Sequence, residues 1–493
     1  MGILARVHWL GLQQISADTN SAHFMSVWQL PQTAALAAQT LGKISRLPGG
    51  GATNAASALL RPLLDDFISA EFYLEILART NSEPATLNPQ FVLALRLPAD
   101  RARLWQTNLA AALQVLNGVR PVATSDGWLL QPTNATGSIE FSRDREWTLV
   151  GIGADKKTLQ SEFAACLARP PAPPAANCWL EADLDVPRLA ALGSSLLTLV
   201  TRHSSLNHLH LAAFGEAGNV RTRATADFSR PLDRPLPSWE IPTNLIHAPL
   251  TSFTIVRGVA PWLATLTAWQ KLRLNPPPDQ AVCWSLAGIP FQTYLAAPLP
   301  AASNQLAQLA SRLVADANPW LATNAAGSLS WSGDPPGILW NNANLLTPFL
   351  FCATFDRHEY LLGGLYPPAG GLPTPPPAGI LDSIIKRPDL LFSSVEQTGI
   401  RVEDGLFISQ LFRVVFHRAQ LPPNAAGTRW LKNIEPLLGE SISVISRDNP
   451  GQMILEREST IGFTALELHV LADWLESPQF PNGLHTLLVP PEY

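Results

Sequence analysis

The sequence predicts an α+β protein of two tandem homologous lobes, each an antiparallel sheet with helices packed on one face. Two observations carry this prediction. The segments 141–151 and 354–364 both hold an Asp-Arg pair, a Glu, an aromatic residue and a short apolar run that ends in Gly, which indicates an internal duplication. Short strand patterns alternate with amphipathic helix patterns and hairpin signals. Because hairpins require antiparallel pairing, this order favours α+β over a parallel α/β sheet.

The repeat continues on both sides of these segments at a nearly constant distance. Gly337 lies 210 residues after Gly127, and Tyr360 lies 213 residues after Trp147. A short strand that leads into a helix is predicted at four places: 23–31, 91–98, 252–261 and 291–298. The helices after the first and third of these strands are expected near 33–45 and 262–273.

Each half ends in a predicted hairpin, at 206–228 and at 441–463. Phe463 lies 235 residues after Phe228, which exceeds the earlier spacing by about two dozen residues. We therefore expect an insertion in the second half, between 416 and 441. Thr464 and Glu467 then form a capping box that opens an amphipathic helix.

The predicted domain organisation follows from these markers and from the proline content. Four prolines between 229 and 242 indicate a stiff, extended linker between the halves. The expected parts are an N-terminal extension at 1–22, a first lobe at 23–230, a Pro-rich linker at 231–250, a second lobe at 251–480 and a C-terminal tail at 481–493.

Composition narrows the classes of partner. The chain has 493 residues, of which 46% are hydrophobic, so each half is long enough to bury a core of its own. Only 15% are charged, the net charge is −5, and no block of like charge occurs, so we expect no nucleic-acid partner. The 15 tryptophans are available for contacts with another molecule.

The termini and the cysteines bear on compartment. His8 and Trp9 interrupt the apolar core that a signal peptide needs, and no apolar run approaches the length of a membrane span, so neither segment is expected in this chain. The spacing of the four cysteines is not that of a redox or metal motif. Cys166 and Cys178 flank a proline-rich loop, and the sequence leaves open whether they are bridged.

The most suggestive polar cluster lies on a predicted strand at 179–185. Alternation places Glu181, Asp183 and Asp185 on one face of this strand, where carboxylates suit a hard cation. His208 and His210 share one face of a later strand and suit zinc or copper. The alternative is that the carboxylates form a solvated face opposite the apolar face of Leu180, Ala182 and Leu184, and that the two imidazoles also point to water. We predict no catalytic residue, no cofactor and no metal, and keep these five as candidates.

The repeated Asp, Arg and Glu of 144–146 and 356–359 resemble twin active sites. They fall where the hairpin turns are expected, and Asp favours turns while Arg and Glu form solvated cross-strand pairs. We therefore interpret them as turn residues without chemistry.

The duplicated halves also carry three segments that resemble a family of uncharacterised bacterial proteins with duplicated α+β domains of unknown function. The segments are 155–163, 183–189 and 459–468. The resemblance implies export or attachment to the cell envelope, hence a periplasmic or envelope-associated location. It supplies no catalytic residues.

Three hypotheses of function follow. The favoured one is a non-catalytic binding or scaffold protein of the bacterial cell envelope, with a protein or an apolar small molecule as partner. The second is a carrier of an apolar ligand in an inter-lobe or sheet–helix cavity. The third is a metal-dependent enzyme that uses the carboxylates of 181–185 with His208 or His210. Any site is expected between the lobes.

Overall fold

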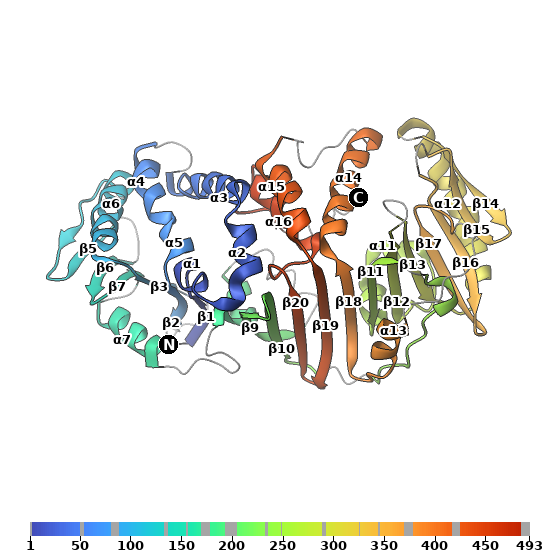
Figure 1. The fold of residues 1–493 in the computed structure, drawn as a ribbon, viewed down its shortest axis with the longest axis horizontal. Helices are drawn as coiled ribbons and strands as arrows, with labels where there is room; N and C mark the ends of the chain where they lie inside the picture. The colour runs from blue at the N-terminus through green and yellow to red at the C-terminus, as the bar shows by residue number, and fades with distance from the viewer. Residues whose placement is uncertain are drawn as a thin grey trace. The chain divides into compact units, whose positions relative to one another are not determined.

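A computed structural model describes most of the chain and divides it into two compact units (Figure 1). The first unit comprises Met1–Pro231, Thr460–Gly462 and Val470–Tyr493, and the second comprises Leu232–Ser459 and Phe463–His469. The described residues are 2–49, 54–79, 88–132, 137–153, 156–168, 178–192, 205–231, 235–247, 249–287, 292–324, 326–343, 346–368, 378–416 and 424–484.

Each unit combines helices with an antiparallel sheet, which confirms the α+β class. Neighbouring strands of the first sheet follow the order β10-β9-β8-β1-β2-β3-β7-β6-β5-β4, and every pair is antiparallel. Its strands are β1 Gly2–Trp9, β2 Phe72–Arg79, β3 Asn88–Arg96, β4 Val122–Ala123, β5 Gly127–Leu130, β6 Ile139–Asp144, β7 Trp147–Ile152, β8 Cys178–Asp185, β9 Leu206–Glu216 and β10 Asn219–Phe228.

Strands of the second sheet pair in the order β20-β19-β18-β11-β12-β13-β17-β16-β15-β14, again all antiparallel. This is the order of the first sheet with every label raised by ten. The strands are β11 Leu250–Arg257, β12 Gln280–Leu286, β13 Thr293–Pro298, β14 Ser328–Gly333, β15 Pro336–Asn341, β16 Phe349–Phe355, β17 His358–Gly364, β18 Leu390–Gln397, β19 Glu440–Asn449 and β20 Gln452–Ser459.

Helices cover both faces of each sheet, which corrects the prediction of one covered face. On β3, Leu95 packs in a core with Trp105 of α6, whereas the neighbouring Ala94 packs with Phe163 of α7. Successive strand residues point to opposite faces, so α6 and α7 lie on opposite sides. The described helices are α1 Leu12–Ile15, α2 Ala22–Trp28, α3 Pro31–Ile44, α4 Asn54–Leu64, α5 Asp66–Ser69, α6 Ala99–Asn117, α7 Lys156–Ala168, α8 Val186–Ala190, α10 Ala260–Thr265, α11 Thr267–Leu272, α12 Ala302–Asn324, α13 Ala378–Ile385, α14 Thr398–Phe416, α15 Ala426–Ile434 and α16 Ala465–Glu476.

The second unit repeats this two-sided arrangement with α12 and α13. Leu361 of β17 lies in a core with Leu306 of α12, and the adjacent Leu362 lies in another with Leu381 of α13. No helix in the part of the chain that the structure describes is both long and apolar enough to cross a membrane.

The segment 23–31, predicted as a strand, is helical over α2 instead. Phe24, Val27 and Trp28 are spaced three and four residues apart, so a helix places all three on one side. Val27 is buried there, and the rings of Phe24 and Trp28 stack with centroids 6.0 Å apart. The strand that matches β11 in pairing is β1, in the stretch expected to be an N-terminal extension, and it lies between β2 and β8.

The described part of the expected linker packs into the second unit. Ile241 and Ile246 are buried in the core that contains Phe253 and Trp284. Residues 232–234 and 248 of the linker, 417–423 of the expected insertion, 291 of the predicted strand and 485–493 of the expected tail lie outside the described residues.

Several local predictions are confirmed. The two repeat segments form the hairpins β6–β7 and β16–β17, and Arg145, Asp356 and Arg357 adopt the positive φ angles that their turns require. Gly127 and Gly337 occupy matching places, where an added Cβ would clash with the carbonyl oxygens of the neighbouring strand. At α16, the Thr464 amide donates to the Glu467 carboxylate at 2.9 Å, as the capping box predicts.

Candidate functional site

Three polar side chains meet on one face of the first sheet, on β8 and β9. Alternation along β8 places Glu181 and Asp183 on the same face. On β9, His210 lies directly opposite Asp183 in the pairing register. Directly opposed side chains are close neighbours in an antiparallel pair, so the register brings an imidazole to the two carboxylates.

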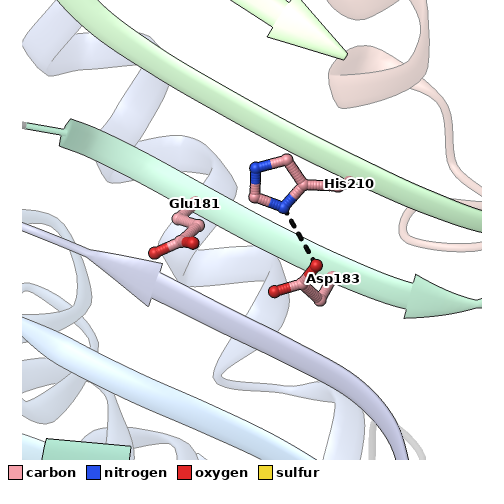
Figure 2. Close-up of side chains that lie close together, drawn as sticks. All are labelled: Glu181, Asp183 and His210. Carbon is pink, nitrogen blue, oxygen red and sulfur yellow. Dashed lines mark hydrogen bonds and ion pairs between the residues drawn. The ribbon is translucent and has the colours of Figure 1, made fainter. Parts of the chain in front are cut away.

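The three side chains converge closely enough to share a ligand (Figure 2). One ligand atom from each of Glu181, Asp183 and His210 can be chosen so that all lie within 4.8 Å of one another. His210 Nδ1 donates a hydrogen bond to Asp183 Oδ1 at 2.9 Å. The Asp183 side chain is 37% exposed, so the cluster is accessible from solvent.

The polar row continues from Asp183 toward the middle of the sheet through Arg6 and Glu75. Arg6 of β1 lies opposite Asp183 on one side and opposite Glu75 of β2 on the other. Its Nε is 3.6 Å from a Glu75 oxygen, and Glu75 is only 1% exposed. The Cys166 thiol of α7 donates to Glu75 at 2.7 Å. Arg6 therefore supplies positive charge between two carboxylates, one buried and one accessible.

The electrostatics of His210 and Asp183 favour the charged form of both side chains. The hydrogen bond from His210 lowers the pKa of Asp183, and the charges of His210, His208 and Arg6 act in the same direction. The same hydrogen bond raises the pKa of His210. An imidazolium and a carboxylate therefore stabilise each other at this place, and a bound cation would replace the proton on the imidazole.

His208 lies at the rim of the cluster, and Asp185 has a separate role. His208 Nε2 is 3.8 Å from Asp183, and its Nδ1 is 3.6 Å from Asp227 of β10. The Asp185 carboxylate accepts a hydrogen bond from the Arg188 amide at 3.2 Å and so caps α8. Four of the five sequence candidates therefore lie together, whereas Asp185 holds the start of a helix.

Sequence reasoning missed Arg6, Glu75 and Asp227 as parts of this polar face. The alternation of Arg6 and His8 on β1 was a usable signal that both share a face. It did not reveal that β1 lies beside β8, because that pairing joins segments far apart in the sequence.

The donor set is mixed, with one imidazole nitrogen and carboxylate oxygens. Zinc binds such donors at about 2.0–2.2 Å in a tetrahedral arrangement, so two of its ligand atoms lie about 3.4 Å apart. His210 Nδ1 and Asp183 Oδ1 are 2.9 Å apart, and the three ligand atoms lie within 4.8 Å of one another, so side-chain movements of up to about 1.4 Å bring the cluster to that geometry. Calcium takes six to eight oxygen ligands, which makes an imidazole a poor partner for it.

The matching positions of the second sheet hold no such donors. The pairings outward from the two repeat hairpins put β18 and β19 in the places of β8 and β9. The residues at the positions of the three cluster members are Ser393, Val395 and Ile442.

A second feature is a hollow of about 200 Å³ in the second unit, beside α14. Its lining residues are Thr251, Leu286, Ala287, Ile400, Glu403, Asp404 and Phe407. Four of them follow the spacing of one helix face on α14. This hollow combines apolar walls with two carboxylates.

Comparisons with known proteins place the chain in no family. No family model matches it, and no curated protein matches it. Among solved structures, TP0453 in crystal form III is similar at 8% sequence identity over 46% of this chain and 77% of that chain, with a TM-score of 0.25. A likeness of that size carries no argument about fold or function.

Proposed function

We propose that this chain is a non-catalytic binding protein whose first unit binds a divalent transition-metal ion through Glu181, Asp183 and His210. The observation that carries the proposal is the convergence of two carboxylates and one imidazole within 4.8 Å, on two adjacent strands. The rigid sheet holds the three Cα positions, so only side-chain rotation is needed for ligation. Zn²⁺ fits the donor set best.

The second unit acts as a scaffold in this proposal, and the two units derive from an internal duplication. The shared strand order of the two sheets supports the duplication, as do the matching repeat hairpins and the glycines Gly127 and Gly337. Uncharged residues at the three ligand positions of the second sheet support a scaffold role for that unit. A place in the bacterial cell envelope is supported by the sequence resemblance alone.

Isothermal titration calorimetry of chelator-treated, untagged protein with Zn²⁺ and Ca²⁺ tests the metal site. We expect one Zn²⁺ per chain and no measurable Ca²⁺ binding. His210→Ala removes the nitrogen donor that lies within 4.8 Å of both carboxylates and is expected to weaken Zn²⁺ binding at least about tenfold. An unchanged affinity in this variant, or wild-type protein without a stoichiometric Zn²⁺ site, contradicts the proposal.

Two matched controls separate ligation from loss of charge or structure. His358 Nδ1 lies 3.3 Å from Glu240 in the second unit and so forms an imidazole–carboxylate pair of similar type. His358→Ala is expected to leave Zn²⁺ affinity unchanged. Asp185→Asn changes a carboxylate on the same strand as Glu181, and it is expected to spare Zn²⁺ binding, since Asp185 caps α8.

A further inference from the structure

We infer that the hollow beside α14 in the second unit binds an arginine side chain presented by a protein partner. This inference is independent of the metal site, which lies in the first unit. It rests on the shape of the hollow, on its apolar walls and on the negative charge around it.

One wall of the hollow is a helix face. Ile400, Glu403, Asp404 and Phe407 lie at spacings of three and four residues on α14, so their side chains point to one side. Ile400 is 44% exposed and Phe407 is 47% exposed. Large apolar side chains that flank charged ones in this way are typical of interaction surfaces.

The opposite wall comes from the sheet. Thr251 of β11, Leu286 at the end of β12 and the adjacent Ala287 complete the lining. The wall is uncharged and mostly apolar, so it suits the aliphatic stem of a long side chain.

Negative charge gathers at the helix side. Burial raises the pKa of Asp404. Burial and the nearby charge of Glu403 raise the pKa of Glu435, the first residue of the 3-10 helix η4 (Glu435–Leu437). Arg401 offsets part of this charge, because its Nη1 lies 3.5 Å from Asp404 and 3.0 Å from the Ser285 hydroxyl. Arg401 pairs with Asp404, whereas Glu403 is an exposed carboxylate of the same lining, so the hollow presents negative charge that a cation would complement.

Size and shape select the occupant. Pockets for small molecules are typically about 300–1,000 Å³, whereas this hollow is about 200 Å³. It holds one side chain better than a whole carried ligand. A guanidinium is favoured over an ammonium, because its planar group can pair with two carboxylate oxygens at once.

The test compares two tripeptides by saturation-transfer difference NMR with the full chain. The probes are N-acetyl-Leu-Arg-Leu-amide and the same peptide with citrulline in place of arginine, which keeps the shape and removes the charge. We expect the arginine peptide to bind at least about tenfold more tightly. Equal affinity for the two peptides, or no binding of either, overturns the inference.

Variants locate the effect. The double variant Glu403→Gln/Asp404→Asn is expected to lose the preference for arginine, whereas Asp382→Asn, an exposed carboxylate on α13 of the same unit, is expected to keep it. Circular dichroism melts check that both variants fold. A preference that survives in the double variant places binding elsewhere and also overturns the inference.

Discussion

The two sheets share one pairing order and carry different chemistry at the same positions. In the first unit, four directly paired residues on neighbouring strands form a row of ionisable side chains, which is buried at one end and accessible to solvent at the other. Its members, from β2 through β1 and β8 to β9, are Glu75, Arg6, Asp183 and His210. At the matching pairing positions of the second unit the row is apolar: Trp284, Phe253, Val395 and Ile442.

On the opposite faces of the same strands, the first unit is apolar and the second unit is polar. In the first unit the neighbouring row is apolar: Leu74, Val7, Ala182 and Leu211. In the second unit the matching row carries thiol and hydroxyl groups: Cys283, Thr254, Ser394 and Ser443. Thr254 and Ser394 hydrogen bond to each other through their hydroxyls at 2.8 Å. Polarity has therefore exchanged faces between the two units.

The helices between the first two strands also differ between the two units. Between β1 and β2, the first unit has the helices α1 to α5, and Ile15, Phe24 and Met25 from this stretch pack in one cluster with Trp9 of β1. By alternation, Trp9 lies on the same face as Val7. Between β11 and β12, the second unit has only the short α10 and α11. Backbone hydrogen bonds set the strand order whichever face is apolar, so the same order of strands can carry different helices and different side chains on its two faces.

The largest expected effect comes from Phe253→Arg, which gives the second unit the residue of the first at this position. Phe253 is 1% exposed and packs in a core with Trp284, so the guanidinium would be buried without a partner. We expect a loss of more than about 4 kcal/mol in the free energy of unfolding. A urea titration measures this loss, and hydrogen exchange of the β11 amides shows whether it affects this strand.

Phe253→Leu controls for the loss of packing alone and is expected to cost about 1–2 kcal/mol. If the two variants unfold at the same urea concentration, burial of charge is not what distinguishes the two rows.

A second, smaller effect is expected from Arg6→Met in the first unit. This change leaves the buried Glu75 carboxylate without its guanidinium neighbour, which is expected to cost about 3 kcal/mol. The double variant Arg6→Met/Glu75→Met makes the pair apolar, as Phe253 and Trp284 are in the second unit. It is expected to recover most of the loss in urea unfolding. If the double variant is no more stable than Arg6→Met, the first sheet does not tolerate apolar residues at positions 6 and 75.

The smallest effect concerns Glu396 on the polar face of the second unit, where the first unit has Leu184 at the same pairing position. Burial raises the pKa of Glu396 above its ordinary value of 4.5. Its contribution to stability is therefore full below pH 4.5 and is lost as the pH rises through the folded-state pKa. The Ala465 amide donates a hydrogen bond to Glu396 Oε1 at 2.7 Å. Glu396→Gln keeps an oxygen acceptor for this amide and removes the buried charge.

We expect thermal melts of Glu396→Gln to show a gain of less than about 1 kcal/mol at pH 7 and no gain at about pH 4. Asp389→Asn serves as the contrast, because the hydrogen bond from Arg387 lowers the pKa of Asp389 and the sign is reversed. A gain in both variants, or a gain of Glu396→Gln that is equal at the two pH values, argues against the burial of charge as the cause.

Much of the second half was predictable from the sequence, as were the hairpins at 206–228 and 441–463, because their signals are local. The hairpins of Trp147 and Tyr360 need only a turn and alternation. The segment 23–31 was predicted wrongly because its apolar residues fit a strand as well as a helix, and packing against Trp179 selected the helix. The strand β1 was missed because the sequence of 2–9 carries apolar residues at both parities.

Of the candidate site, the sequence by itself determined which side chains share a strand face: Glu181 with Asp183, and His208 with His210. Alternation is a property of the strand alone, so it needs no knowledge of neighbours. Only the tertiary structure decided that β8 lies between β1 and β9, which sets Arg6 and His210 on either side of Asp183. It also assigned Asp185 to the cap of α8. The physical reason is that strand neighbours and register depend on hydrogen bonds and packing across the whole sheet, and a local pattern holds no information about them.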